Sequence, residues 1–253
     1  MNINGICISS TTDEHGTIYV YQTRTSRILS FDRKIYQSSM KLNDINGLDL
    51  SYTQAMMTGL LFISKVKTAT IMGLGAGSMA KNLLSSFSEL DIHAVEYREA
   101  VAKVAKKYFF VPDTDRIIIH IDDAVNHMKN TDIKSDIIFS DLYNFEGMEP
   151  KQVQPSYLRD CKNTLNKHGV LVLNIWHTAL SSGEELDELL ALEFNNRLLS
   201  FEVDSGNTIV LAFKNDIPSI KREELLAKGE WLQEEMNIPM ERYAKLLWDT
   251  QDL

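Results

Sequence analysis

The sequence predicts an α/β fold, in which a small β domain precedes a Rossmann-like domain whose parallel sheet ends in an antiparallel hairpin. From residue 68 onward, short apolar runs alternate with helical segments, as in right-handed βαβ units that cover both faces of a parallel sheet. The last two apolar runs are separated only by the turn-like Ser205-Gly206, which is too short for a helical crossover. The first 50 residues instead alternate β-branched or aromatic residues with polar ones, which predicts short strands.

The small N-terminal β domain is expected over residues 1–50. In GTIYVYQTRTSRILSFDRKIYQSSM the alternation is broken by short polar turns, which predicts an antiparallel meander or a pair of hairpins. The Rossmann-like domain is expected over residues 51–253. It opens with a segment of helical spacing, Leu50 to Ser64.

Five apolar runs are predicted as the parallel strands of the larger domain: ATIMG, DIHAVE, RIIIHI, DIIFSD and GVLVLNIW. The segments RLLSFEVD and NTIVLAFKN form the terminal hairpin, and the tail from Ile217 is helical and amphipathic. A parallel sheet that ends in a hairpin is typical of adenosylmethionine-dependent transferases rather than of nicotinamide dehydrogenases.

Composition and charge narrow the class of partner. The chain has 35 acidic and 26 basic residues, a formal net charge of −9, and an acidic surface repels nucleic acid and anionic lipid. Its two cysteines have no metal-like spacing, and the N-terminus lacks the pattern of a signal peptide. We therefore expect a cytoplasmic protein that binds no metal and has neither nucleic acid nor a membrane as a partner.

The stretch ATIMGLGAGSMAKNLL contains three glycines, Gly73, Gly75 and Gly77, between a predicted strand and a predicted helix. Glycine tolerates positive φ and lets a ligand approach the backbone, but a tight strand-to-helix turn also uses it. A pyrophosphate fingerprint would need glycine where Ser78 stands, so the loop alone leaves a nicotinamide site as an alternative.

Carboxylates follow the next two strands. Glu96 ends DIHAVE, about 20 residues after the glycine loop, where a carboxylate can accept the ribose hydroxyls of a nucleoside. Asp122 and Asp123 follow RIIIHI, and we expect one of them to face the cleft and the other to cap the helix that begins at Ala124. Because all these residues end parallel strands at one edge of the sheet, they predict an adenosyl pocket.

The fourth strand supplies a candidate catalytic residue. SDIIFSDLYN ends in Asp141, which is followed on the same loop by Tyr143 and Asn144. A carboxylate at this position can hold a protonated amine and then accept its proton, which leaves the nitrogen free to attack carbon. Tyr143 and Asn144 can add hydrogen bonds to the substrate but no negative charge.

These motifs resemble those of the spermidine synthase family, the polyamine aminopropyltransferases, over roughly residues 16 to 215. The family's glutamine and S-Y segment correspond to KIYQSS and LSYTQAM, and its G-G-G-D-G loop to GLGAG. Its V-E-I-D, D-D-G and D-S-S-D motifs correspond to VEYR, DDA and DLYN.

The resemblance implies a polyamine-biosynthetic transferase with decarboxylated S-adenosylmethionine or S-adenosylmethionine as co-substrate. Glu96 would bind the ribose, while Asp123 and Ala124 of the DDA motif would bind the adenine. The methionine-derived arm would lie near Gln37, Tyr52 and the Gly73–Gly77 loop. Asp141 would orient and deprotonate a small-molecule amine, and the protein would be a homodimer.

Three family positions differ. Ala76 replaces the loop aspartate that faces the aminopropyl amine, Asn144 replaces the second acid of D-S-S-D, and Arg98 replaces the acid of V-E-I-D. An ammonium that is buried without an anionic partner is costly, so we expect an acceptor smaller or less charged than spermidine. Two alternatives stay open: an S-adenosylmethionine-dependent methyltransferase, and a non-catalytic binding protein that kept the fold.

Overall fold

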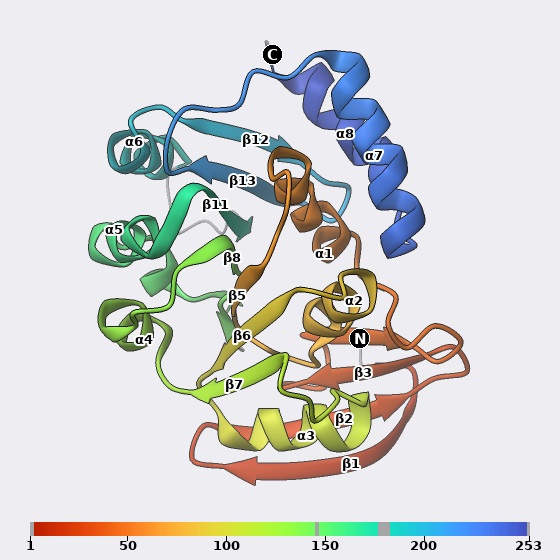
Figure 1. The fold of residues 1–253 in the computed structure, drawn as a ribbon. Coiled ribbons are helices and arrows are strands. Elements are labelled where there is room, and N and C mark those ends of the chain that lie inside the picture. The colour runs from red at the N-terminus through yellow and green to blue at the C-terminus, as the bar shows by residue number, and fades with distance from the viewer. Residues whose placement is uncertain (1–2, 145–146, 177–182, 252–253) are drawn as a thin grey trace.

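The computed structural model describes residues 3–144, 147–176 and 183–251. The chain begins with a four-stranded antiparallel meander, drawn in red to orange in Figure 1, in the spatial order β1-β2-β3-β4. Its strands are β1 (Ile6–Asp13), β2 (Gly16–Gln22), β3 (Ser26–Ser30) and β4 (Ser38–Lys41). This small sheet confirms the antiparallel structure expected near the N-terminus.

The second sheet has seven strands in the order β12-β13-β11-β8-β5-β6-β7. Neighbouring strands within this sheet are parallel, except that β13 pairs antiparallel with both β11 and β12. Its strands are β5 (Thr68–Met72), β6 (Asp91–Glu96), β7 (Ile117–Ile121), β8 (Ser135–Ser140), β11 (Leu165–Trp176), β12 (Leu198–Glu202) and β13 (Asn207–Phe213). The predicted fold class, a parallel sheet that ends in an antiparallel hairpin, is therefore confirmed.

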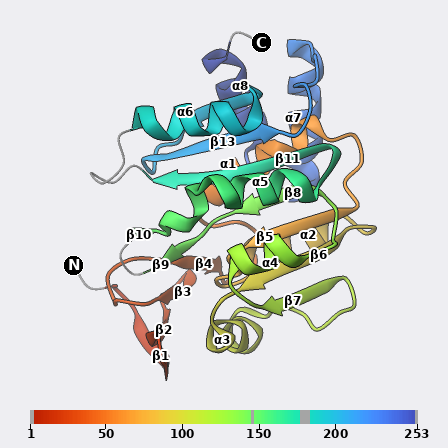
Figure 2. The same cartoon turned by 90° about the vertical axis from the view of Figure 1, so that its left-hand side faces the viewer.

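Helices cover both faces of this sheet (Figures 1 and 2). One face packs in a large apolar cluster against α1 (Ser51–Met56), the 3₁₀ helix η1 (Met57–Phe62), α2 (Ser78–Ser86), α7 (Arg222–Met236) and α8 (Met240–Thr250). The other face packs against α4 (Ala124–Asn130), α5 (Pro155–Thr164) and α6 (Gly183–Phe194). Two short strands, β9 (Tyr143–Asn144) and β10 (Gly147–Met148), and the 3₁₀ helix η2 (Pro150–Val153) follow β8.

The helix α3 (Glu99–Phe109) joins the two sheets. Its Val101, Val104 and Phe109 are buried in one cluster with Ile18 and Val20 of β2. The small sheet is thereby fixed beside the edge of the large sheet at which β5, β6, β7 and β8 end.

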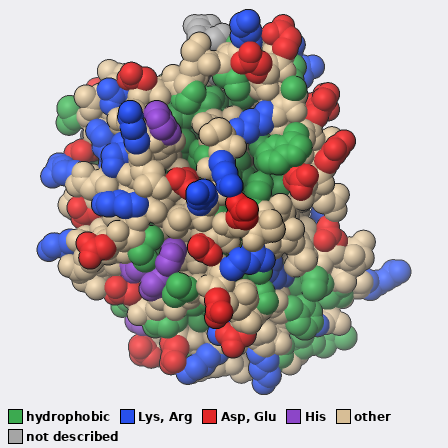
Figure 3. Space-filling view, in the orientation of Figure 1, with side chains coloured by type: hydrophobic (Ala, Val, Ile, Leu, Met, Phe, Trp, Pro, Cys, Tyr) green, Lys and Arg blue, Asp and Glu red, His purple; other side chains and the backbone are tan. Residues whose placement is uncertain are grey.

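The surface in the view of Figure 3 carries acidic and basic side chains that are interspersed rather than gathered into one basic patch. No helix in the described ranges combines the length and the hydropathy that crossing a membrane requires.

Candidate active site

A cavity of about 940 Å³ lies where the carboxyl ends of four parallel strands meet the N-terminal sheet. This position, at the point where strand order reverses between β5 and β8, is where open α/β sheets commonly bind ligands. Among the sequence-predicted residues, nine line the cavity: Gln37, Tyr52, Gly73, Gly75, Glu96, Asp123, Ala124, Asp141 and Tyr143. Asn144 belongs to β9, but its side chain lies outside the described part of the structure.

The glycine loop between β5 and α2 has positive φ at all three glycines. At Gly73, where φ is 91°, a Cβ atom would overlap the carbonyl oxygen of Asp141, so only glycine lets the two loops pack this closely. Gly75 lines the cavity, and its N–H donates to Glu96 Oε2 at 3.3 Å. The ends of β5, β6 and β8 are thereby held together.

Gly77 and Ala76 take other places than expected. Gly77 is not among the residues that line the cavity; it is the left-handed N-cap of α2, and a Cβ there would overlap Val111. The side chain of Ala76 is fully buried in the cluster of the N-terminal sheet and α3. We expected position 76 to change the charge beside the ligand's arm, and this burial away from the cavity corrects that expectation.

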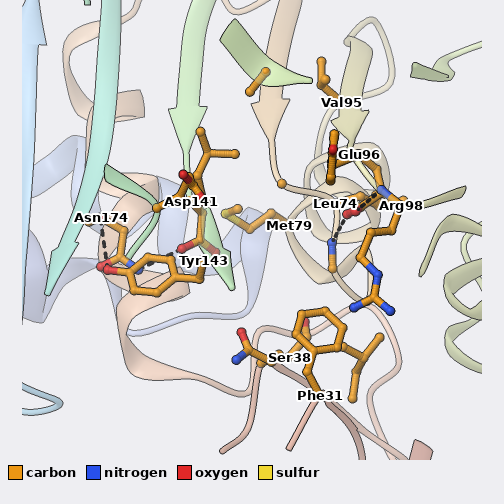
Figure 4. A pocket seen from close by; sticks show the side chains of 18 of the residues that line it. Phe31, Ser38, Leu74, Met79, Val95, Glu96, Arg98, Asp141, Tyr143 and Asn174 are labelled. Carbon is orange, nitrogen blue, oxygen red and sulfur yellow. Dashed lines mark hydrogen bonds between the residues drawn. The ribbon is translucent and has the colours of Figure 1, made fainter. Parts of the chain in front are cut away.

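Glu96 is held in place by the backbone. Only 8% exposed, it accepts hydrogen bonds from the N–H of Arg98 at 2.9 Å and from that of Gly75. Burial raises its pKa, while these hydrogen bonds act in the opposite direction. The carboxylate is thus fixed at the end of β6 before any ligand binds (Figure 4).

Arg98, which we noted only as a replaced acid, connects the site to the N-terminal sheet. Its Nε and Nη2 donate to the two carboxylate oxygens of Asp13 at 3.0 and 2.7 Å, and its Nη2 also donates to the carbonyl of Gly16 at 2.8 Å. The guanidinium lies over the ring of Phe31, 4.7 Å from its centroid. Arg98 therefore holds the β1–β2 turn close to Glu96, which lies two residues earlier in the chain.

Asp123, which follows β7, is the N-cap of α4; the sequence had left this role open between Asp122 and Asp123. Its Oδ1 accepts from the N–H groups of Val125 and Asn126, and its Oδ2 pairs with Lys151 Nζ at 3.0 Å. Burial alone would raise the pKa of Asp123, but Lys151 and the cap hydrogen bonds hold it below its usual value. Asp122 also lines the cavity and accepts from the side-chain amide of Asn126. Asp123 therefore both caps α4 and lines the cavity, so the two roles are not divided between the two aspartates.

Asp141 lies opposite Glu96, with Leu74 and Met79 between them in the close-up of Figure 4. Its Oδ1 accepts from Asn174 Nδ2 at 2.8 Å, and its Oδ2 accepts from Tyr52 Oη at the longer distance of 3.4 Å. Burial raises the pKa of Asp141 to about 6, against the effect of these two hydrogen bonds. A carboxylate with this pKa is ionised at neutral pH and can still accept a proton.

At the Asp141 end, the predicted Tyr143 lies beside several residues that were not predicted from the sequence. Tyr143 donates to the backbone carbonyl of Asn174 at 3.2 Å, and burial raises its pKa, so its hydroxyl stays neutral. Asn174, Trp176, Ser205 and Asn207 line the same region, from β11 and the β12–β13 hairpin. The one available signal was the polar Asn174 within the apolar run GVLVLNIW, because a buried amide needs hydrogen-bond partners.

Within the described residues, no group of three or more His, Cys, Asp and Glu side chains is arranged to hold a metal ion. The strand order, an otherwise parallel sheet with an antiparallel β13, is that of the adenosylmethionine-dependent transferase fold.

Comparison with known proteins identifies the family. The sequence profile of the spermine/spermidine synthase domain matches residues 50–189. A polyamine aminopropyltransferase from Chromobacterium violaceum is 30% identical over 206 residues, which cover 80% of this chain and 77% of that enzyme. The chain belongs to the spermine/spermidine synthase family, and the predictions of this family and of an aminopropyltransferase-type enzyme are confirmed.

Solved structures with the same fold include two spermidine synthase-type proteins. A probable spermidine synthase from Corynebacterium glutamicum gives a TM-score of 0.75 at 19% identity, over 96% of this chain and 94% of that chain. A spermidine synthase in complex with the transition state analogue AdoDATO gives 0.64 at 14% identity, over 91% and 88% of the two chains.

Proposed function

We propose that the protein transfers an aminopropyl group from decarboxylated S-adenosylmethionine to a small amine. The observation that carries this proposal is Asp141, a partly buried carboxylate with a pKa of about 6 that lines the cavity beside the glycine loop. Its negative charge at neutral pH can bind an ammonium group, and the carboxylate can then accept the proton.

The reaction assigned to this site is a nucleophilic displacement. Asp141 accepts a proton from the bound ammonium, which frees the nitrogen lone pair. The nitrogen then attacks the aminopropyl carbon bonded to the sulfonium; the new C–N bond forms as the C–S bond breaks. The electron pair of the broken bond stays on sulfur, and neutral methylthioadenosine leaves.

The charges around the cavity support a co-substrate without a carboxylate. Among the described residues, six acidic ones line it: Glu14, Glu96, Asp122, Asp123, Asp141 and Glu149. Its described lysine and arginine side chains already have partners, since Arg98 pairs with Asp13 and Lys151 pairs with Asp123. A methionine carboxylate would enter an acidic cavity without such a cation to receive it, whereas a sulfonium with an ammonium arm is complementary to it.

For the adenosyl half, we assign Glu96 to the ribose hydroxyls and the Asp123–Ala124 segment to the adenine. Gln37, Tyr52, Gly73 and Gly75 would surround the aminopropyl arm, as their place in the cavity wall supports. Tyr52 also donates to Asp141, so the arm and the acceptor amine would meet at this hydrogen bond.

For the acceptor, we assign Asp141, Tyr143 and Asn144 as the binding residues. Asp141 is the member of this group that carries a negative charge, and Tyr143 is kept neutral by burial. We therefore expect a monoamine or a short diamine to be a better acceptor than spermidine.

We further propose that the protein is a cytoplasmic homodimer with domains at 1–50 and 51–253. The edge strand β1 is exposed along most of its length, with Ile6 75% exposed, and such an edge favours pairing with another chain. Cys7 and Cys161 are free thiols, which supports a reducing compartment. If β1 forms the dimer interface, Ile6→Asp should halve the mass measured by light scattering; an unchanged mass would contradict this interface.

The experiment that tests the proposed function is a turnover assay with decarboxylated S-adenosylmethionine and a panel of mono-, di- and triamines. Methylthioadenosine and the aminopropylated amine should appear with the wild-type protein, and Asp141→Asn should abolish both. Equal product from the two proteins would show that Asp141 is not the base. A methylated amine formed from S-adenosylmethionine would instead favour a methyltransferase.

A further inference from the structure

Three polar side chains connect the β12–β13 hairpin to Asp141 through consecutive hydrogen bonds. Ser205 Oγ donates to Asn207 Oδ1 at 2.7 Å, and Asn207 Nδ2 donates to Asn174 Oδ1 at 2.9 Å. Asn174 Nδ2 then donates to Asp141 Oδ1 at 2.8 Å. Asn174 and Asn207 are only 1% and 9% exposed, so their amides depend on these partners rather than on bulk water.

The direction of every hydrogen bond in this chain follows from the charge of Asp141. An ionised carboxylate only accepts, so Asn174 must turn its NH₂ group toward Asp141 and its oxygen toward Asn207. Asn207 must then turn its own NH₂ group toward Asn174 and its oxygen toward the hydroxyl of Ser205. Donors aligned in one direction polarise one another, which strengthens the hydrogen bond at the end of the chain.

The same chain distinguishes the two oxygens of Asp141. Oδ1 is engaged by Asn174 at 2.8 Å, whereas Oδ2 has the longer contact of 3.4 Å with Tyr52. Oδ2 is therefore the oxygen better placed to exchange its present contact for a substrate ammonium.

We propose that Ser205, Asn207 and Asn174 form a donor chain that positions the Asp141 carboxylate, keeps it ionised and directs Oδ2 toward the acceptor amine. The assignment of the amine to Oδ2 rests on the proposed function, whereas the effect on the Asp141 carboxylate does not. These three are positioning residues, because they act on the reaction through Asp141.

The other ionisable side chains that face Asp141 in the described structure are Tyr52 from α1 and Tyr143 from β9. Burial raises the pKa of both, so neither changes charge near neutral pH. A shift in the titration of Asp141 after a change in the donor chain would therefore not come from these neighbours.

The decisive variant is Asn207→Leu, which keeps the branched shape of the side chain but removes the donor that orients Asn174. In protein labelled with ¹³C-aspartate, the Asp141 carboxyl carbon, assigned with Asp141→Asn, should titrate about one pH unit higher than in the wild type. If Asp141 is the base, a smaller fraction of it is ionised in this variant near neutral pH. The loss of ionised Asp141 alone should then lower kcat/KM about fivefold at pH 6 but less than twofold at pH 8.5. The KM for decarboxylated S-adenosylmethionine should stay unchanged.

The matched control is Asn82→Leu on α2. Asn82 is 2% exposed and donates to the carbonyls of Asn46 and Met236, both at 3.0 Å, and it does not line the cavity. This variant should lower the melting temperature without moving the titration of Asp141.

If Asn207→Leu does not fold, Ser205→Ala serves in its place, with Ser205→Thr as the conservative variant that restores the wild-type titration. An unshifted Asp141 titration in a folded Asn207→Leu or Ser205→Ala variant would overturn the proposal. A shifted titration in a protein that shows no aminopropyl transfer would support the donor chain while refuting the proposed function.

Discussion

Replacing Asp141 by asparagine should stabilise the protein above pH 6 while it abolishes turnover. Burial raises the pKa of Asp141 from 3.8 to about 6, a shift of about 2 units that corresponds to about 3 kcal/mol. The folded state binds this proton more tightly than the unfolded state does. The stabilisation from protonated Asp141 is therefore complete below about pH 4 and is lost as the pH rises toward 6. Asparagine is neutral at every pH, so it avoids the cost of burying the charge.

The assay is urea unfolding of the wild type and of Asp141→Asn between pH 4.5 and 8. The free energy of unfolding of Asp141→Asn minus that of the wild type should rise by about 2 kcal/mol from pH 4.5 to pH 7 and then level off. The exposed Asp115→Asn is the control, and it should change the free energy of unfolding by less than about 0.5 kcal/mol. An Asp141→Asn protein that is less stable than the wild type at pH 7, or a gain that does not vary with pH, would refute a desolvated carboxylate here.

Two further substitutions test the remaining parts of the site. Glu96→Gln should weaken methylthioadenosine binding by about 1.5–3 kcal/mol, because a charge-assisted hydrogen bond to the ribose is lost; calorimetry beside the surface control Glu89→Gln checks this, and equal affinities would remove Glu96 from the site. Gly73→Ala should destabilise the protein by about 1–3 kcal/mol more than Gly16→Ala, as measured by thermal unfolding. Both glycines have positive φ, but only the Cβ at Gly73 would overlap Asp141, so equal losses would disprove that contact.

Local sequence patterns were sufficient to predict the fold and several of the residues that line the cavity. The apolar runs set the strands, the short Ser205-Gly206 connection required a hairpin, and strands that end at one edge brought Gly75, Glu96 and Asp141 together. These inferences succeeded because they depend on the periodicity and connectivity of neighbouring segments.

The contacts between distant segments could not be predicted in this way. Arg98 and Asp13 are far apart in the chain, and nothing near either residue indicates that they pair. The ion pair between Asp123 and Lys151 likewise joins the end of β7 to η2, 28 residues further along the chain. The burial of Ala76 under the N-terminal sheet follows from the docking of two separate sheets, which no local spacing specifies.

The most direct test of the account is calorimetry with decarboxylated S-adenosylmethionine and with S-adenosylmethionine, each titrated into the wild-type protein. The two ligands differ only in the carboxylate, for which the described lining offers acidic neighbours and no lysine or arginine without a partner. We predict that the decarboxylated ligand binds at least about tenfold more tightly, a difference of about 1.4 kcal/mol. Equal affinity, or tighter binding of S-adenosylmethionine, would contradict a site built for aminopropyl transfer.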